Sequence, residues 1–173
     1  MRLYFMRHAQ AMNVGDWGGA DAARPLTDEG RSRAAQAAAG LARINPGIEA
    51  IISSPYARAY ETALITGRAL GLAVTTSDAL LPGFSLASLD VALAMRPDVG
   101  GVLFVGHEPD MSGVVNALAG NASKDDVTMK KGSCAFIQSP FDVEGGASME
   151  ELVGKCSLVW VRTWRQLAAL RAE

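Results

Sequence analysis

The chain has 173 residues, 49% of them hydrophobic, which suffices for one domain with a substantial core and falls short of two ordinary ones. Its 16 Lys and Arg against 18 Asp and Glu give a net charge of -2, so no overall positive field draws it to nucleic acid or to an acidic membrane. Any anion site must therefore be local. We expect a single, monomeric domain over residues 1–173.

The first ten residues, MRLYFMRHAQ, hold only a short apolar stretch between Arg2 and Arg7. A signal peptide or a membrane-spanning helix needs a much longer one, so we expect a cytoplasmic protein with no membrane association. The two cysteines, Cys134 and Cys156, lack the C-x-x-C spacing of metal and redox motifs. We expect them to be small buried hydrophobic residues rather than a disulfide.

Strand and helix signals alternate along the chain. Short apolar runs bounded by charge or turn residues predict buried strands, and Thr27, followed by two acidic residues, predicts a helix N-cap. Ser54 and Pro55 have the N-cap and first-turn preferences of a second helix, which places Arg58 in its first turn. The expected strands are 3–6, 50–53, 72–75, 101–105, 133–138 and 157–161, and the expected helices are 27–43, 55–70, 111–119 and 163–171, with a loop at 8–25 and a Leu-rich segment of open assignment at 80–95.

This alternation is typical of an α/β protein. We expect a three-layer sandwich with a mostly parallel central sheet and helices on both faces. Ligands of such sheets bind beyond the carboxyl ends of the strands, and parallel strands bring those ends to one edge. Three segments directly follow expected strands: Arg7-His8, Ser54-Pro55 with Arg58, and Gly106-His107. Residues far apart in the chain are therefore expected to converge on one site.

The converging residues are two arginines and two histidines, with no obvious cluster of carboxylates beside them. A phosphoryl group carries its charge on several oxygens, and guanidinium groups match that geometry with paired hydrogen bonds. A histidine near neutral pH is largely uncharged and can attack phosphorus, which divides hydrolysis into two easier transfers. The set predicts a phosphohydrolase with His8 as nucleophile, in which Arg7, Arg58 and His107 hold the phosphoryl group without a metal or other cofactor.

Four motifs in order extend this interpretation to a family. They are Met6-Arg7-His8-Ala9, Arg24-Pro25-Leu26-Thr27 with Gly30, Ser54-Pro55-Tyr56-Ala57-Arg58-Ala59-Tyr60-Glu61-Thr62, and Gly106-His107-Glu108-Pro109. In the order and spacing of these motifs, the chain up to about Ala119 resembles the histidine phosphatase superfamily. The short length and the RPLT element are most similar to its small bacterial phosphohistidine phosphatase branch, the SixA-like proteins.

The resemblance implies a phosphoglycerate mutase-like fold and a covalent phosphohistidine intermediate on His8. It also implies that Arg7 and Arg58 bind the phosphoryl oxygens, that His107 completes the pocket, and that Arg24 lies at its rim. The function that it favours is removal of phosphate from a phosphohistidine of a protein domain. A small-molecule phosphomonoesterase of the same fold and a non-catalytic binder of phosphorylated partners are the alternatives.

The sequence departs from larger members of that family in two places. Those members carry a glutamate general acid after the second-helix motif, whereas residues 80–86 here contain no carboxylate and are only flanked by Asp78 and Asp90. The mutases also tend to have Asn six positions after the nucleophile, where this chain has Val14. An alkoxide leaving group needs a proton from an acid, whereas a protonated phosphoimidazole leaves as neutral imidazole. The missing acid therefore favours cleavage of a P–N bond.

Two carboxylates that follow the second histidine leave alternatives open. Glu108 or Asp110 could act as the acid if its side chain turned into the site, which would suit a phosphomonoester. With His8 and His107 they could also form a zinc site, although the two arginines nearby would repel a cation. We therefore expect no metal.

Overall fold

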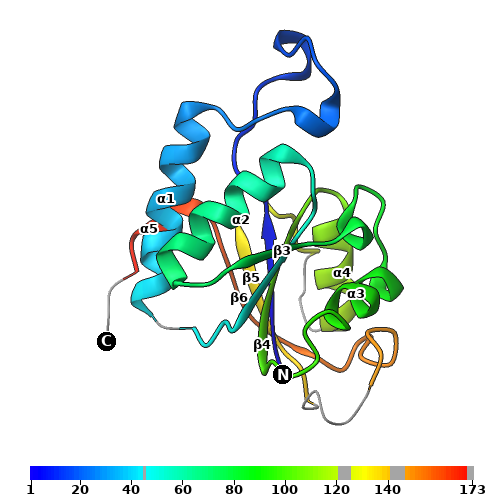
Figure 1. The fold of residues 1–173 in the computed structure, drawn as a ribbon. Coiled ribbons are helices and arrows are strands. Elements are labelled where there is room, and N and C mark those ends of the chain that lie inside the picture. Colours follow the sequence, from blue (N-terminus) through cyan, green and yellow to red (C-terminus); the bar gives the residue numbers. More distant parts are fainter. Residues whose placement is uncertain (45, 121–125, 141–146, 171–173) are drawn as a thin grey trace.

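The computed structural model describes residues 1–44, 46–120, 126–140 and 147–170. Across these residues, six strands form one sheet in the order β3-β2-β4-β1-β5-β6 (Figure 1). The strands β1 (Arg2–Arg7), β2 (Ala50–Ser53), β3 (Val74–Thr76) and β4 (Gly101–Gly106) are parallel, and β5 (Cys134–Gln138) pairs antiparallel with both β1 and β6 (Ser157–Arg162). The predicted mostly parallel central sheet is confirmed.

Helices cover both faces of the sheet (Figure 1). On one face lie α1 (Asp28–Arg43), α2 (Ala57–Leu70) and α5 (Trp164–Ala168), and on the other α3 (Leu86–Leu93) and α4 (Asp110–Ala119). Side chains of β1 alternate between the two layers, because successive strand residues point to opposite faces. Tyr4 and Met6 pack toward the first group of helices, Leu3 and Phe5 toward the second, and all four are buried. The predicted three-layer sandwich is confirmed.

The starts of the first two helices differ in how well the sequence predicts them. The Thr27 hydroxyl accepts a hydrogen bond from the Gly30 N–H at 3.0 Å, as expected of an N-cap. The prediction of Ser54 as the N-cap of α2 is wrong, because the cap is Tyr56. Ser54 still continues the sheet, its N–H donating to the Val105 carbonyl at 2.9 Å, so the helix begins two residues later than expected.

Other boundaries shift by one to three residues, since helix and strand ends are the least certain parts of such assignments. The strand β3 begins at Val74 rather than at residue 72. The Leu-rich segment 80–95 contains α3, whose first turn is closed by a capping box between Ser85 and Ser88. The C-terminal helix ends at Ala168, and Arg171, the end predicted for it, lies outside the described residues.

A close contact ties α1 to the segment after β1. A Cβ atom placed on Gly30 would lie 2.0 Å from the carbonyl oxygen of Gln10, so only glycine allows this approach. That carbonyl also accepts a hydrogen bond from the Thr27 N–H at 3.0 Å. The start of α1 therefore packs directly against the backbone that follows His8.

Candidate active site

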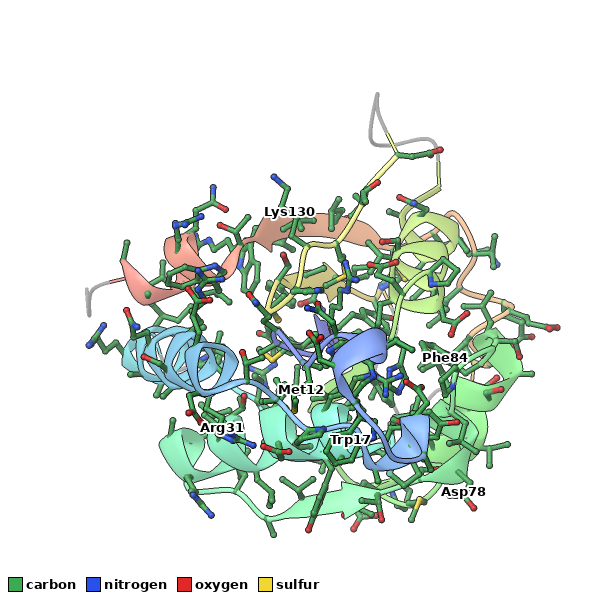
Figure 2. The ribbon with its side chains drawn as sticks, turned by 90° about the horizontal axis from the view of Figure 1, so that it is seen from above. Met12, Trp17, Arg31, Asp78, Phe84 and Lys130 are labelled. Atoms are coloured by element: carbon green, nitrogen blue, oxygen red, sulfur yellow. The ribbon has the colours of Figure 1, made fainter. Side chains whose placement is uncertain are left out.

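The carboxyl ends of the parallel strands bring the predicted site residues together. Arg7 is the last residue of β1 and His8 follows it, His107 follows β4, and Arg58 lies in the first turn of α2, which comes after β2. His8, Arg58 and His107 are buried, with 8%, 5% and 2% of their surface exposed. Figure 2 looks down on this edge of the sheet, with Lys130 toward the β5–β6 side and Asp78 toward the opposite side.

His8 is held in one orientation by backbone groups of neighbouring residues. The ring atom Nδ1 lies 2.7 Å from the Ala9 carbonyl oxygen, and the backbone N–H of His8 donates to the Gly106 carbonyl at 3.0 Å. Burial, opposed by the Ala9 hydrogen bond and assisted by the positive charges around it, lowers the pKa of His8 from 6.5 to about 3. The ring is therefore neutral at physiological pH. Because a carbonyl only accepts, the proton lies on Nδ1 and the lone pair on Nε2.

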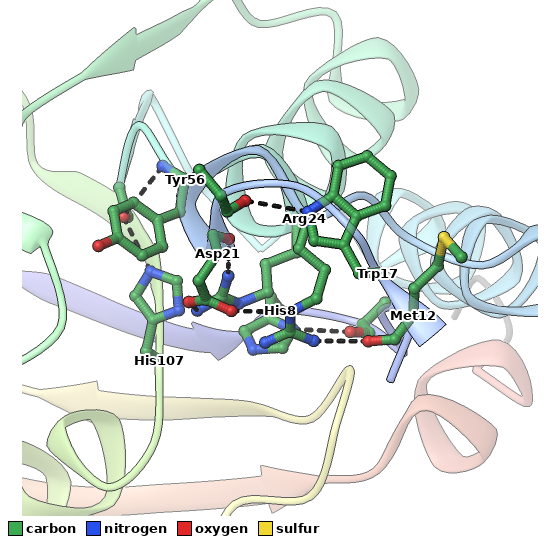
Figure 3. A network of polar contacts seen from close by, with 11 residues as sticks. His8, Met12, Trp17, Asp21, Arg24, Tyr56 and His107 are labelled. Carbon is green, nitrogen blue, oxygen red and sulfur yellow. Dashed lines mark hydrogen bonds and ion pairs between the residues drawn. The ribbon is translucent and has the colours of Figure 1, made fainter. Parts of the chain in front are cut away.

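His107 faces His8 across the site. The two ring centroids are 5.4 Å apart, and the Tyr56 ring meets the other side of His107 edge-on at 5.3 Å (Figure 3). The Nε2 atom of His107 pairs with the Ser54 hydroxyl at 2.9 Å. Burial and then the charge of Arg58 lower the pKa of His107 from 6.5 to about 4. Ser54 is thus a member of the site and not a helix cap.

Arg58 is held by a loop residue that the sequence did not point to. Its guanidinium donates to the Asp21 carbonyl at 2.9 Å and to the Asp21 carboxylate at 3.1 Å, and it stacks over the Tyr56 ring with its Cζ 5.0 Å from the centroid. Burial lowers the pKa of Arg58, and the charge of Asp21 opposes that shift. The helix N-terminus alone is a poor place for an arginine, so Asp21 provides the compensating negative charge.

Arg7 is positioned by a segment more than a hundred residues away in the chain. Its guanidinium donates to the Met129 carbonyl at 2.9 Å, across a separation of 122 residues. The Gly132 N–H donates to the carbonyls of both Arg7 and His8, at 3.2 and 3.1 Å. The turn before β5 therefore locks the backbone of both site residues at the end of β1.

Arg24 anchors the loop between β1 and α1. It donates to the Asp21 carboxylate at 2.8 Å and to the Met12 carbonyl at 2.6 Å, and 14% of its side-chain surface is exposed. The Arg24 hydrogen bond, with Arg58 adding to it, lowers the pKa of Asp21, so that carboxylate is charged. Figure 3 shows Trp17 beside Arg24 on the same loop, and the indole N–H closes the turn by donating to the Ala20 carbonyl at 3.0 Å.

Thr62 joins the residue after His8 to Arg58 and was missed by reasoning from the sequence. Its buried hydroxyl accepts from the Ala9 N–H at 3.1 Å and donates to the Arg58 carbonyl at 2.7 Å. A position one helical turn after Arg58 shares its face of α2, which is the signal that could have found it. For Asp21 and for the Met129 carbonyl, the sequence holds no such signal.

Three buried nitrogens at the site have no partner within the described residues: the Nε atoms of Arg7 and Arg58, and Nδ1 of His107. Buried polar groups of native proteins are nearly always hydrogen-bonded. Guanidinium N–H groups only donate, so their natural complement is an acceptor such as an anionic oxygen. The site therefore has the character of an anion-binding pocket.

The two carboxylates proposed as alternative acids are both engaged elsewhere. The Asp110 carboxylate accepts from the Gly83 N–H at 2.7 Å, and the Glu108 carboxylate accepts from the Ser112 hydroxyl at 2.7 Å. Glu108 still lies close enough to raise the pKa of Arg7 against the effect of burial. Of the two, Glu108 is the one whose charge reaches the site.

Comparison with known proteins places these observations in a family. A model of the histidine phosphatase superfamily (branch 1) matches residues 3–81, which include His8, Arg24 and Arg58. An uncharacterized protein of Picosynechococcus sp. is 34% identical over 143 residues, which span 80% of this chain and 86% of that protein. The chain belongs to the histidine phosphatase superfamily. The family predicted from the four motifs is confirmed.

Solved structures show that this histidine phosphatase has the expected fold. The protein histidine phosphatase SixA complexed with tungstate has a TM-score of 0.75 at 22% identity, covering 96% of this chain and 99% of that one. SixA from Agrobacterium tumefaciens has a TM-score of 0.73 at 23% identity, with 94% and 97% covered. A mycobacterial glucosyl-3-phosphoglycerate phosphatase has a TM-score of 0.64 at 22% identity, with 91% and 96% covered. The predicted phosphoglycerate mutase-like fold is confirmed, and these likenesses concern the fold.

The helices carry one further finding. In the part of the chain that the structure describes, no helix is both long enough and apolar enough to cross a membrane.

Proposed function

We propose that this histidine phosphatase hydrolyses phosphohistidine on a protein through a covalent intermediate on His8. The observation that carries the proposal is the state of the His8 ring, neutral and with Nδ1 committed to the Ala9 carbonyl at 2.7 Å. This leaves the Nε2 lone pair for attack on phosphorus, and the attacking atom needs no base to remove a proton first. Burial keeps the ring neutral, and the charges of Arg58 and Arg7, which lower the pKa of His8 further, also attract the phosphoryl group.

The proposed reaction has two balanced steps. The Nε2 lone pair of His8 forms a bond to phosphorus while the P–N bond of the substrate breaks, and its electron pair returns to the departing imidazole. Water then attacks the phosphorus, the Nε2–P bond breaks with its electron pair returning to His8, and a water proton passes to solvent. Arg7 and Arg58 neutralise the charge on the equatorial oxygens in both steps, and the uncharged His107 donates a hydrogen bond to them. Arg24 acts at the rim through Asp21.

The choice of a P–N bond follows from the acids around the site. Residues 80–86 contain no carboxylate, and the Asp110 carboxylate is taken by the Gly83 N–H. An alkoxide leaving group would depart without its proton, and a general acid is typically worth about 10² to 10⁴ in rate. A phosphoimidazole that is protonated on its other nitrogen leaves as a neutral molecule. The fold shared with SixA, a protein histidine phosphatase, supports the same substrate class.

A second candidate is a phosphomonoesterase that acts on small molecules. Two observations favour it: Glu108 lies near Arg7, and the fold is also shared with a glucosyl-3-phosphoglycerate phosphatase. Turnover of a phosphohistidine protein, a sugar phosphate and an aryl phosphate by the same enzyme separates the candidates. Fast turnover of the sugar phosphate with slow turnover of phosphohistidine would reject the P–N proposal, and loss of that turnover in Glu108→Gln would identify the acid.

Covalent labelling tests the nucleophile itself. The enzyme is mixed with a phosphohistidine protein that carries radiolabelled phosphate, quenched rapidly, and examined for acid-labile, base-stable label. The chain has two histidines, so His8→Ala and His107→Ala form a matched pair. We expect label on the wild type and, at a slower rate, on His107→Ala, and none on His8→Ala. A protein that binds the phosphorylated partner but never takes up label would instead be a non-catalytic binder.

A further inference from the structure

A second pocket lies beside the phosphoryl site and shares Arg7 with it. It has a volume of about 350 Å³. Its walls come from α1, from the turn before β5 and from the start of α5, and they are formed by Arg7, Gln10, Arg33, Lys130, Lys131, Thr163, Trp164 and Arg165. Figure 2 shows Lys130 on the β5–β6 side of the sheet edge, away from Asp78 at the β3 side.

The lining of this pocket is strongly basic in a chain whose net charge is only -2. Arg33, Lys130, Lys131 and Arg165 add four positive charges to that of Arg7. Within the described residues, Arg33 is the member of these four with an ion-pair partner, Glu29. Lys130, Lys131 and Arg165 are exposed. The excess charge is therefore a property of this surface, which offers several cations that no carboxylate of the described residues neutralises.

Two of these cations are held in place by an aromatic ring. The guanidinium Cζ atoms of Arg33 and Arg165 lie 5.0 and 4.8 Å from the Trp164 ring, and the Arg33 guanidinium also donates to the Gln10 side chain at 2.9 Å. Stacking on an aromatic face fixes a guanidinium without using up its hydrogen-bond donors. This wall of the pocket is thus ordered before any ligand arrives.

The turn that carries Lys130 and Lys131 is bonded directly to the backbone at His8. Gly132, which follows the two lysines, donates its N–H to the carbonyls of Arg7 and His8. Met129, which precedes them, accepts a hydrogen bond from the Arg7 guanidinium at its carbonyl. Anything bound over Lys130 and Lys131 is therefore held at a fixed offset from His8. A substrate whose phosphoryl group reaches His8 extends over this pocket if it is large enough to leave the phosphoryl site on that side.

We propose that this pocket docks acidic side chains of the phosphorylated protein beside its phosphohistidine, an inference that rests on the proposed function. Four cations on three separate segments, three of them exposed, suit the scattered carboxylates of a protein surface. A second phosphate of a small molecule would be better served by a buried, convergent set of donors. Exposed complementary charges act mainly by steering association, so the pocket sets the apparent affinity for the protein substrate rather than the chemical step.

The test compares two pairs of charge removals of equal size. Lys130→Gln/Lys131→Gln acts in the pocket, and Arg68→Gln/Lys155→Gln removes two exposed charges elsewhere. The substrates are phosphoramidate, and a phosphotransfer domain phosphorylated on histidine, prepared with its neighbouring acidic residues either intact or changed to amides. We expect the pocket pair to raise KM for the acidic domain about tenfold at low ionic strength, and to leave kcat and phosphoramidate turnover unchanged. High salt or the neutralised domain should abolish the difference.

Three results would overturn the proposal. The KM for the acidic domain could stay unchanged, the distant pair could have the same effect, or phosphoramidate turnover could fall equally, which would assign the lysines to the phosphoryl site. Titration of His8→Ala with the phosphorylated domain measures docking without turnover. Charge-dependent binding there, without label on the wild type, would reject the proposed catalysis and retain the docking pocket.

Discussion

The Asp21 carboxylate accepts a hydrogen bond from the Arg58 guanidinium at 3.1 Å, at the edge of the sheet where His8 and His107 meet. An acidic residue of the segment between β1 and α1 is thus ion-paired with one of the cations that we expect to bind the phosphoryl group. A phosphoryl anion and this carboxylate have charges of the same sign, so they compete for Arg58. Half of the Asp21 side chain is exposed, so Asp21 rather than the buried Arg58 can turn toward solvent when a phosphoryl group binds.

We expect Asp21→Asn to strengthen phosphate binding. Removing a like charge at this partly exposed position is worth about 1 kcal/mol, or roughly fivefold in the inhibition constant of inorganic phosphate. Asp28→Asn, which removes an exposed carboxylate paired with Arg31 in α1, is the matched control and should have no effect. Weaker phosphate binding by Asp21→Asn would mean instead that the carboxylate is needed to orient Arg58.

The two histidines make stability depend on pH in a defined direction. Burial lowers the pKa of His8 to about 3 and that of His107 to about 4, while both titrate near 6.5 in the unfolded chain. Between these values the unfolded state binds more protons, so the free energy of unfolding falls as the pH falls. The stability is full above about pH 6.5 and is lost toward pH 4 and below, with a slope of at most about 1.4 kcal/mol per pH unit for each histidine.

Urea denaturation at several pH values between about 7.5 and 5 measures this slope. His8 and His107 are the chain's two histidines, so His8→Gln and His107→Gln should each flatten the dependence. Asp21, whose pKa is lowered from 3.8, loses its contribution to stability only below this pH range, so it does not affect the measured slope. A slope that is the same in both variants as in the wild type would show that other groups carry it.

The contact between α1 and the segment after His8 is tested by Gly30→Ala. Alanine gains about 1 kcal/mol of helix propensity over glycine, but its Cβ would lie 2.0 Å from the Gln10 carbonyl, which belongs to the backbone and cannot rotate away. Overpacking of this kind costs about 1 to 3 kcal/mol, so we expect a lower melting temperature together with a lower kcat. Gly15→Ala, where no atom lies within 4 Å, should change neither. Retained stability and activity in Gly30→Ala would show that the segment after His8 is free to move.

Thr62→Val tests the bond that joins the two halves of the site. The substitution keeps the shape of the side chain but leaves the Ala9 N–H without its acceptor, at a cost of about 1 to 3 kcal/mol. Thr66→Val makes the same change one turn later, where the hydroxyl donates only to the Thr62 carbonyl and weakly to a methionine sulfur, and should cost less. The free energies of unfolding of both variants, measured by denaturation together with kcat, show whether Thr62→Val costs more than Thr66→Val. Equal losses would mean that Thr62 contributes only ordinary packing.

The sequence was sufficient for the sheet and for the residues at the ends of its parallel strands. Runs such as residues 101–105 are apolar because both faces of the sheet are covered, and a strand buried in this way has a local signature. His8 and His107 follow such strands directly, so the topology alone brings them to one edge. The Thr27 cap was equally readable, because a hydroxyl before acidic residues satisfies the first N–H groups of a helix.

What escaped the sequence are contacts made by tertiary structure. Ser54 has a side chain that is typical of an N-cap, but its backbone N–H is hydrogen-bonded to the neighbouring strand β4 and its hydroxyl to His107. Asp21 begins a 3-10 helix of only three residues and Met129 lies in a loop, so neither has a periodic sequence pattern, and their roles arise only where they meet an arginine. The basic pocket is likewise assembled from four separate segments, which only the fold brings together; they contribute Arg7 with Gln10, Arg33, Lys130 with Lys131, and residues 163–165.

The position of β1 in the middle of the sheet has a consequence for how the protein is made. This strand precedes the other five in the chain, yet its neighbours β4 and β5 begin only at Gly101 and Cys134. The Arg7 side chain also depends on a distant residue, because the carbonyl that accepts its hydrogen bond belongs to Met129, 122 residues away. Contacts of such long sequence separation slow folding, since the chain must close a large loop before it gains them. A nascent chain that ends before Met129 therefore carries His8 and Arg7 without the carbonyl that orients Arg7, and the site that we propose is assembled only after that segment has been made.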